Sequence, residues 1–127
     1  MYNVLIAESN GGLRNLLASV LGAAGYEVMI AGDGMEALDV AEACGSRIDL
    51  LCANLTIAGV NGTSLAERLQ ARHPGMKVVL LVTENPWVIS VDTRAADRHA
   101  DFAVLRKPFT IEEFRAKVLA TLPPVAA

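Results

Sequence analysis

The sequence is poor in residues that mark several classes of protein. It has two cysteines, Cys44 and Cys52, with no Cys-x-x-Cys pair and no nearby histidine, which argues against a metal site. We expect both to be buried or half-buried thiols. Aromatic residues make up 5% of the chain. Lysine and arginine are scattered rather than clustered, so we expect no direct binding to nucleic acid.

Long hydrophobic runs are also lacking. The first apolar run, Val4–Ala7, is broken at Glu8 and is preceded by no basic residue, so it suits neither a signal peptide nor a membrane span. We therefore expect a cytoplasmic protein without a membrane partner. The length of 127 residues suits one domain. We expect it at residues 1–122, with a C-terminal tail or linker stub at 123–127.

What the chain does have is a regular alternation of short apolar runs with segments of helical spacing. The predicted strands are residues 4–7, 26–31, 49–53, 78–82 and 102–105. Helices are predicted after each strand, and Thr110 with Glu113 forms a capping box while Phe109 and Phe114 occupy hydrophobic-staple positions. The fourth helix, within residues 87–99, is predicted to be short or mobile because that segment begins with poor helix formers.

This alternation predicts an α/β fold, in which a parallel sheet carries helices on both faces. Right-handed crossovers favour the flavodoxin-like (βα)5 doubly wound sandwich, with strand order 2-1-3-4-5. Sites in such sheets form at the carboxyl ends of the strands. The polar residues predicted at that edge are Glu8, Ser9, Asn54, Thr83 and Lys107.

Over essentially the whole chain, these positions and their flanks resemble the receiver domains of bacterial two-component response regulators. Lys107-Pro108-Phe109 resembles the Lys-Pro-Phe of that family, and Thr83 its switch threonine. The stretch Asp49–Leu55, followed by the loop from Gly59 to Gly62, resembles the phosphoacceptor strand and its loop. The resemblance implies a site in which three acidic side chains hold Mg²⁺, an aspartate attacks a phosphoryl group, and Lys and Thr stabilise the product.

The chain departs from that pattern at the decisive positions. Asn54 stands where the family has its phosphoacceptor aspartate, and an amide can neither attack phosphorus nor bring a full charge to a metal. Ser9 replaces the second acid, Glu84 stands where a small residue is usual, and Val104 replaces the switch aromatic. We therefore expect a degenerate receiver with no catalytic residue, no cofactor, and at best weak Mg²⁺ binding through Glu8.

The polar residues of the former site are expected to form a hydrogen-bonded cluster. In this cluster we expect Lys107 to contact Glu8 and Asn54 to bond with Ser9 or Thr83, while Glu84 would repel a phosphoryl group or pair with Lys107.

Because receivers act through other proteins, the resemblance also implies a protein partner: a histidine kinase, an effector, an output domain or a second copy. The expected face comprises the fourth helix, fifth strand and fifth helix, including Trp87, Val104 and Arg106.

Two alternatives stay open at this stage. A working phosphorelay receiver could use another acceptor, either Asp49 or Ser9, although Asp49 begins its strand and so lies at the opposite edge from Lys107. A flavodoxin-like cofactor-binding protein could cradle a phosphate with Ser9-Asn10-Gly11-Gly12 at a helix N-terminus. Only Trp87 is placed to serve as an aromatic platform for a flavin, which makes this alternative the weaker one.

Overall fold

The computed structural model describes residues 2–57, 59–83 and 102–122. Five parallel strands form one sheet in the order β2-β1-β3-β4-β5, which confirms the predicted topology. The strands are β1 (Asn3–Ala7), β2 (Glu27–Ala31), β3 (Leu50–Asn54), β4 (Lys77–Thr83) and β5 (Phe102–Lys107).

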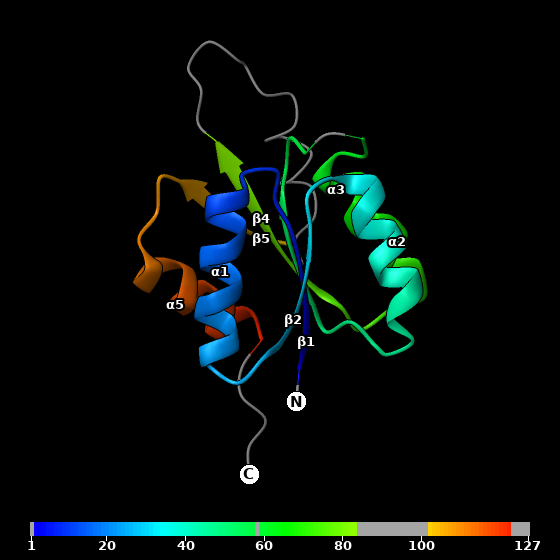
Figure 1. Ribbon diagram of the computed structural model, residues 1–127, viewed down its shortest axis with the longest axis horizontal. Coiled ribbons are helices and arrows are strands. Elements are labelled where there is room, and N and C mark those ends of the chain that lie inside the picture. The colour runs from blue at the N-terminus through cyan, green and yellow to red at the C-terminus, as the bar shows by residue number, and fades with distance from the viewer. Residues whose placement is uncertain (1, 58, 84–101, 123–127) are drawn as a thin grey trace.

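Helices cover both faces of this sheet (Figure 1). They are α1 (Gly11–Ala23), α2 (Gly34–Cys44), α3 (Gly62–Arg72) and α5 (Ile111–Thr121). One hydrophobic cluster lies between the sheet and the pair α1 and α5, and the other between the sheet and the pair α2 and α3. The predicted fourth helix lies outside the described residues.

Several strands extend further than their apolar runs predicted. Asn54, Thr83 and Lys107 are the last residues of β3, β4 and β5 rather than the first residues of the loops. Strand pairing accounts for this, because Asn54 is in register with Leu81, and Thr83 with Lys107. Backbone hydrogen bonds across the sheet thus hold polar residues in strands that the hydrophobic pattern alone would end.

The helix starts follow their local sequence closely. Thr110 and Glu113 form the predicted capping box at the start of α5. The rings of Phe109 and Phe114 stack with centroids 5.9 Å apart, as the staple prediction requires. Asp33 caps α2 by accepting a hydrogen bond from the backbone N–H of Glu36. These contacts span three to five residues, so the sequence contains all the information they need.

The cysteines lie as predicted, with Cys52 buried in β3 and Cys44 half-buried at the end of α2. Burial raises the pKa of the Cys52 thiol to about 12. A membrane span would need a longer and more apolar helix than any in the described part of the chain.

Candidate functional site

Three side chains from the ends of three chain segments, at strands β1, β3 and β5, meet at the carboxyl edge of the sheet. Glu8 directly follows β1, while Asn54 and Lys107 are the last residues of β3 and β5. The Lys107 Nζ lies 3.0 Å from Glu8 Oε2 in a salt bridge, and the Asn54 Nδ2 lies 3.4 Å from Glu8 Oε1. The predicted contact between Lys107 and Glu8 is therefore present, and Glu8 is the centre of the cluster.

The Glu8 carboxylate is almost completely withdrawn from solvent, since the residue is 1% exposed. Besides Lys107 and Asn54, the backbone N–H of Asn10 donates to Oε1 at 3.2 Å. Arg14 fixes the neighbouring backbone, because its Nη1 donates to the Glu8 carbonyl oxygen at 2.9 Å. A buried carboxylate needs such partners to offset its lost hydration, and Lys107, Asn54 and the Asn10 N–H supply them here.

Asn54 has a partner that was not predicted. Its amide nitrogen faces the buried carboxylate of Glu8, and no hydrogen bond joins it to Ser9 among the described residues. The predicted alternative partner, Thr83, has a side chain outside the described part of the structure. Ser9 is exposed, whereas Asn54 is 7% exposed. The other amide atom, Oδ1, is buried and has no hydrogen-bond partner among the described residues. Asn54 thus serves Glu8 as a donor and has a spare acceptor.

The remaining predicted site residues are only partly described. Thr83 ends β4, and its side chain lies outside the described part of the structure. Glu84 and Trp87 lie outside the described residues altogether. Val104 is half-buried in β5 and packs against the core that α2 and α3 cover, while Arg106 is exposed on the same strand.

The structure weighs against Asp49 as a substitute acceptor. Its Oδ2 accepts a hydrogen bond from the backbone N–H of Asn3 at 2.8 Å, and its Oδ1 from Arg47 Nε at 3.0 Å. It precedes β3, at the edge of the sheet opposite Lys107. Asp49 therefore joins the start of β1 to the start of β3 and lies far from the cluster around Glu8.

In the loop that could cradle a phosphate, the side chain of Asn10 already bonds a backbone amide at the start of α1. Asn10 is the N-cap of α1, and its Oδ1 accepts from the Leu13 N–H at 3.0 Å. One of the free amides that an anion would use is therefore already bonded. Neither this cap nor the contacts of Asn10 and Arg14 with Glu8 were predicted from the sequence. The signal that could have predicted the cap is a polar residue directly before an apolar helix.

Comparison with known proteins decides the family. The family model described as "Response regulator receiver domain" matches residues 4–119. The chain belongs to this family. Sporulation initiation phosphotransferase F of Bacillus subtilis is 28% identical to this receiver over 120 residues, which cover 94% of this chain and 93% of that relative. Sensory transduction protein RegX3 of Mycolicibacterium smegmatis is 32% identical over 124 residues, covering 96% of this chain but 51% of the relative.

Solved structures agree with this assignment. The receiver domain from the hybrid histidine kinase CckA is 27% identical, with a TM-score of 0.76, and the match covers 94% of this chain and 98% of that one. A CheY-like receiver protein from Methanospirillum hungatei is 23% identical with a TM-score of 0.81, covering 96% of this chain and 94% of that one, and shows the shared fold. Receivers are signal-transduction domains that interact with histidine kinases and output domains.

The residues of this receiver fit the family's Mg²⁺ poorly. Magnesium needs several charged or carbonyl oxygens in a near-octahedral arrangement. In the described residues, no group of three or more His, Cys, Asp or Glu side chains is placed to hold a metal ion. Among the described residues, the cluster has one carboxylate, that of Glu8, which already accepts from the Lys107 ammonium and the Asn54 amide. A cation would have to displace a positive charge at 3.0 Å from the oxygen that it needs.

Proposed function

We propose that this receiver is a pseudo-receiver, a signalling domain that acts through protein binding without being phosphorylated. The observation that carries the proposal is the pairing of Asn54 with Glu8 at the edge of the sheet where the family has its acceptor aspartate. An amide supplies no nucleophilic oxygen at physiological pH, and its nitrogen is engaged by the buried carboxylate. The position is therefore used for structure rather than for phosphoryl transfer.

Lys107 supports the same proposal. In a phosphorylated receiver a lysine at this position would stabilise the product, but here its ammonium is held by Glu8 at 3.0 Å. Lys107 thus balances the negative charge of Glu8, and the neutral Asn54 amide donates a hydrogen bond to the same carboxylate. Neither Asp49 nor the exposed Ser9 offers a better acceptor, because Asp49 is bonded at the opposite edge and the carboxylate of Glu8, the residue beside Ser9, is already paired with Lys107.

A small-molecule phosphoryl donor with Mg²⁺ tests this proposal. After incubation with acetyl phosphate, intact-mass measurement should show no phosphorylated wild-type protein. The matched variant carries Asn54→Asp and Ser9→Asp, which restore the acidic residues, and we expect it to gain a phosphoryl group. A phosphoryl group on the wild-type protein that maps to Ser9, Asp49 or Asn54 would sink the proposal.

We further propose that the partner is a protein, a histidine kinase, an effector or an output domain, bound at the face that includes β5. Without an acceptor aspartate, regulation must come from partner concentration or from a ligand that prefers one conformation, since only differential affinity shifts a population. Trp87→Ala and Arg106→Glu should weaken binding of an adjacent kinase or effector. Glu42→Arg on α2 is the control, and an equal loss from this change would place the interface elsewhere.

A further inference from the structure

A groove runs between α1 and α5, on the face of the sheet opposite α2 and α3. Its larger part is a cavity of about 340 Å³ lined by Ser19, Val20, Ala23, Ala24, Ile111 and Arg115. A second cavity of about 180 Å³ shares Ala24 and Arg115 with it and extends to Leu119. Because the two cavities share these lining residues, we treat them as one groove, the α1–α5 groove.

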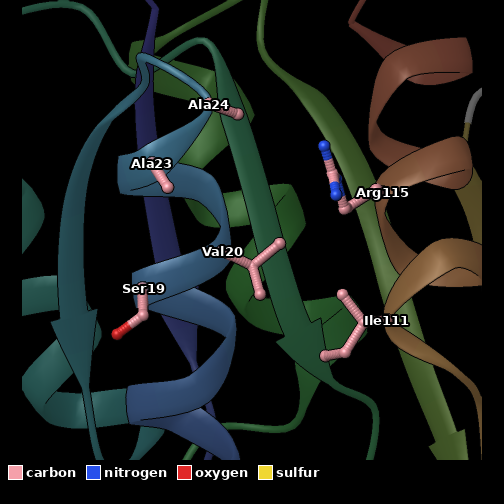
Figure 2. A pocket seen from close by; sticks show the side chains of 6 residues that line it. All are labelled: Ser19, Val20, Ala23, Ala24, Ile111 and Arg115. Carbon is pink, nitrogen blue, oxygen red and sulfur yellow. The ribbon is translucent and has the colours of Figure 1, made fainter.

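Apolar side chains make up most of this groove. Figure 2 shows Val20 of α1 and Ile111 of α5 pointing toward one another, with the Arg115 side chain in the space between the helices. Leu16 lies one helical turn before Val20 and is 47% exposed, and Leu119 lies one turn after Arg115 and is 51% exposed. Large exposed apolar side chains that adjoin a hollow are typical of a surface that binds another protein.

Few charged residues lie beside the groove, and two of them on α5 carry opposite charges. The only charged residue of α1 is Arg14, which is bonded to the Glu8 carbonyl. On α5, Glu112 and Arg115 are both exposed, and within the described residues the side chain of neither has an ion pair or a hydrogen bond. They stand three residues apart and therefore on the same side of the helix.

We propose that a second copy of this chain binds at the α1–α5 groove, related by a two-fold axis. When this axis is perpendicular to α5, the two α5 helices run in opposite directions, and Arg115 of each copy faces Glu112 of the other. The contact is self-complementary, with two ion pairs and with Leu119 of each copy in the interface. A different protein with a single carboxylate for Arg115 would leave Glu112 unmatched, and for this reason the charges favour a second copy.

Charge exchange tests the proposal. Sedimentation at increasing concentration should show a reversible dimer of the wild-type protein. Arg115→Glu and Glu112→Arg should each raise the dimer dissociation constant at least about tenfold, because each creates two like-charge contacts across the axis. The double variant carrying both changes restores opposite charges, and its dissociation constant should return to within about threefold of the wild-type value.

Two further variants separate the groove from a general surface effect. Leu119→Asp should abolish the dimer, whereas Met35→Asp on α2, at a residue that is 53% exposed, should leave it intact. All variants alter exposed positions, and thermal unfolding checks that each one folds. The proposal is overturned by a wild-type protein that stays monomeric up to about 1 mM, by a double variant as weak as the single ones, or by equal losses from Leu119→Asp and Met35→Asp.

Discussion

Lys107 and Glu8 lie 99 residues apart in the sequence, and the ammonium of one lies 3.0 Å from the carboxylate of the other. The exposures of the two side chains differ, at 19% for Lys107 and 1% for Glu8. Most of the energetic consequence therefore concerns Glu8, whose other donors among the described residues are neutral, so that loss of Lys107 would leave a buried charge. This asymmetry leads to the first prediction.

Lys107→Met should lower the free energy of unfolding by about 2 to 3 kcal/mol, less than for a fully buried pair because solvent screens part of the interaction. Adding Glu8→Gln should recover most of the loss, because the uncompensated charge is then gone. Arg47→Ala is the comparison. Its side chain is 76% exposed in its salt bridge with Asp49, and the cost should stay below about 1 kcal/mol. Urea unfolding measures all three, and equal costs for Lys107→Met and Arg47→Ala would contradict this account of Glu8.

Mg²⁺ should bind the wild-type protein weakly, because Glu8 is the one carboxylate that the described residues bring to the cluster and is already paired with Lys107. Asn54→Asp together with Ser9→Asp should strengthen binding by at least about tenfold, since hard cations require several charged oxygens. Isothermal titration with MgCl₂ measures both proteins. If the wild-type protein binds Mg²⁺ as tightly as the double variant, the two missing carboxylates are not what limits affinity.

The two thiols should differ in reactivity at neutral pH. Cys52 is fully buried in β3, and desolvation raises its pKa to about 12 from the ordinary value of 9.0. Half-buried Cys44 should react with a thiol reagent in the native protein, while Cys52 should react only after unfolding. Peptide mapping after labelling decides this, and labelling of Cys52 at the same rate as Cys44 would show that β3 opens readily.

The raised pKa of Cys52 also predicts a loss of stability at high pH. The unfolded thiol loses its proton above pH 9.0, whereas the folded thiol keeps its proton until about pH 12. The neutral thiol therefore contributes its full stability below pH 9.0, and the contribution is lost as the pH rises toward 12. Cys52→Ala should show a shallower decline in unfolding free energy over this range. Parallel pH profiles for the two proteins would rule out Cys52 as the cause.

Two glycines should respond in opposite ways to alanine. A Cβ at Gly34, at the start of α2, would lie 2.7 Å from the Val60 backbone nitrogen, so Gly34→Ala should destabilise the protein by about 1 to 3 kcal/mol. A Cβ at Gly22 would meet no atom within 4 Å, so Gly22→Ala should stabilise α1 by about 0.5 kcal/mol through its higher helix propensity. Thermal unfolding compares them, and a neutral Gly34→Ala would mean that the loop at Val60 yields easily.

The sequence by itself determined the sheet order and most helix starts. These depend on short-range information: the apolar runs, the capping pair Thr110 and Glu113, and the fixed handedness of the crossovers. It also identified which residues come to the carboxyl edge of the sheet, because the ends of parallel strands share one edge.

Only the tertiary structure decided how those residues pair. Asn54 bonds with Glu8 and not with exposed Ser9, because the fold buries the carboxylate and brings Lys107 to it from 99 residues away. The α1–α5 groove also lay beyond the sequence, since Val20 and Ile111 belong to separate helices that only packing brings together. A hydrogen-bond partner or a shared groove depends on distances between distant segments, and no local pattern of residues contains those distances.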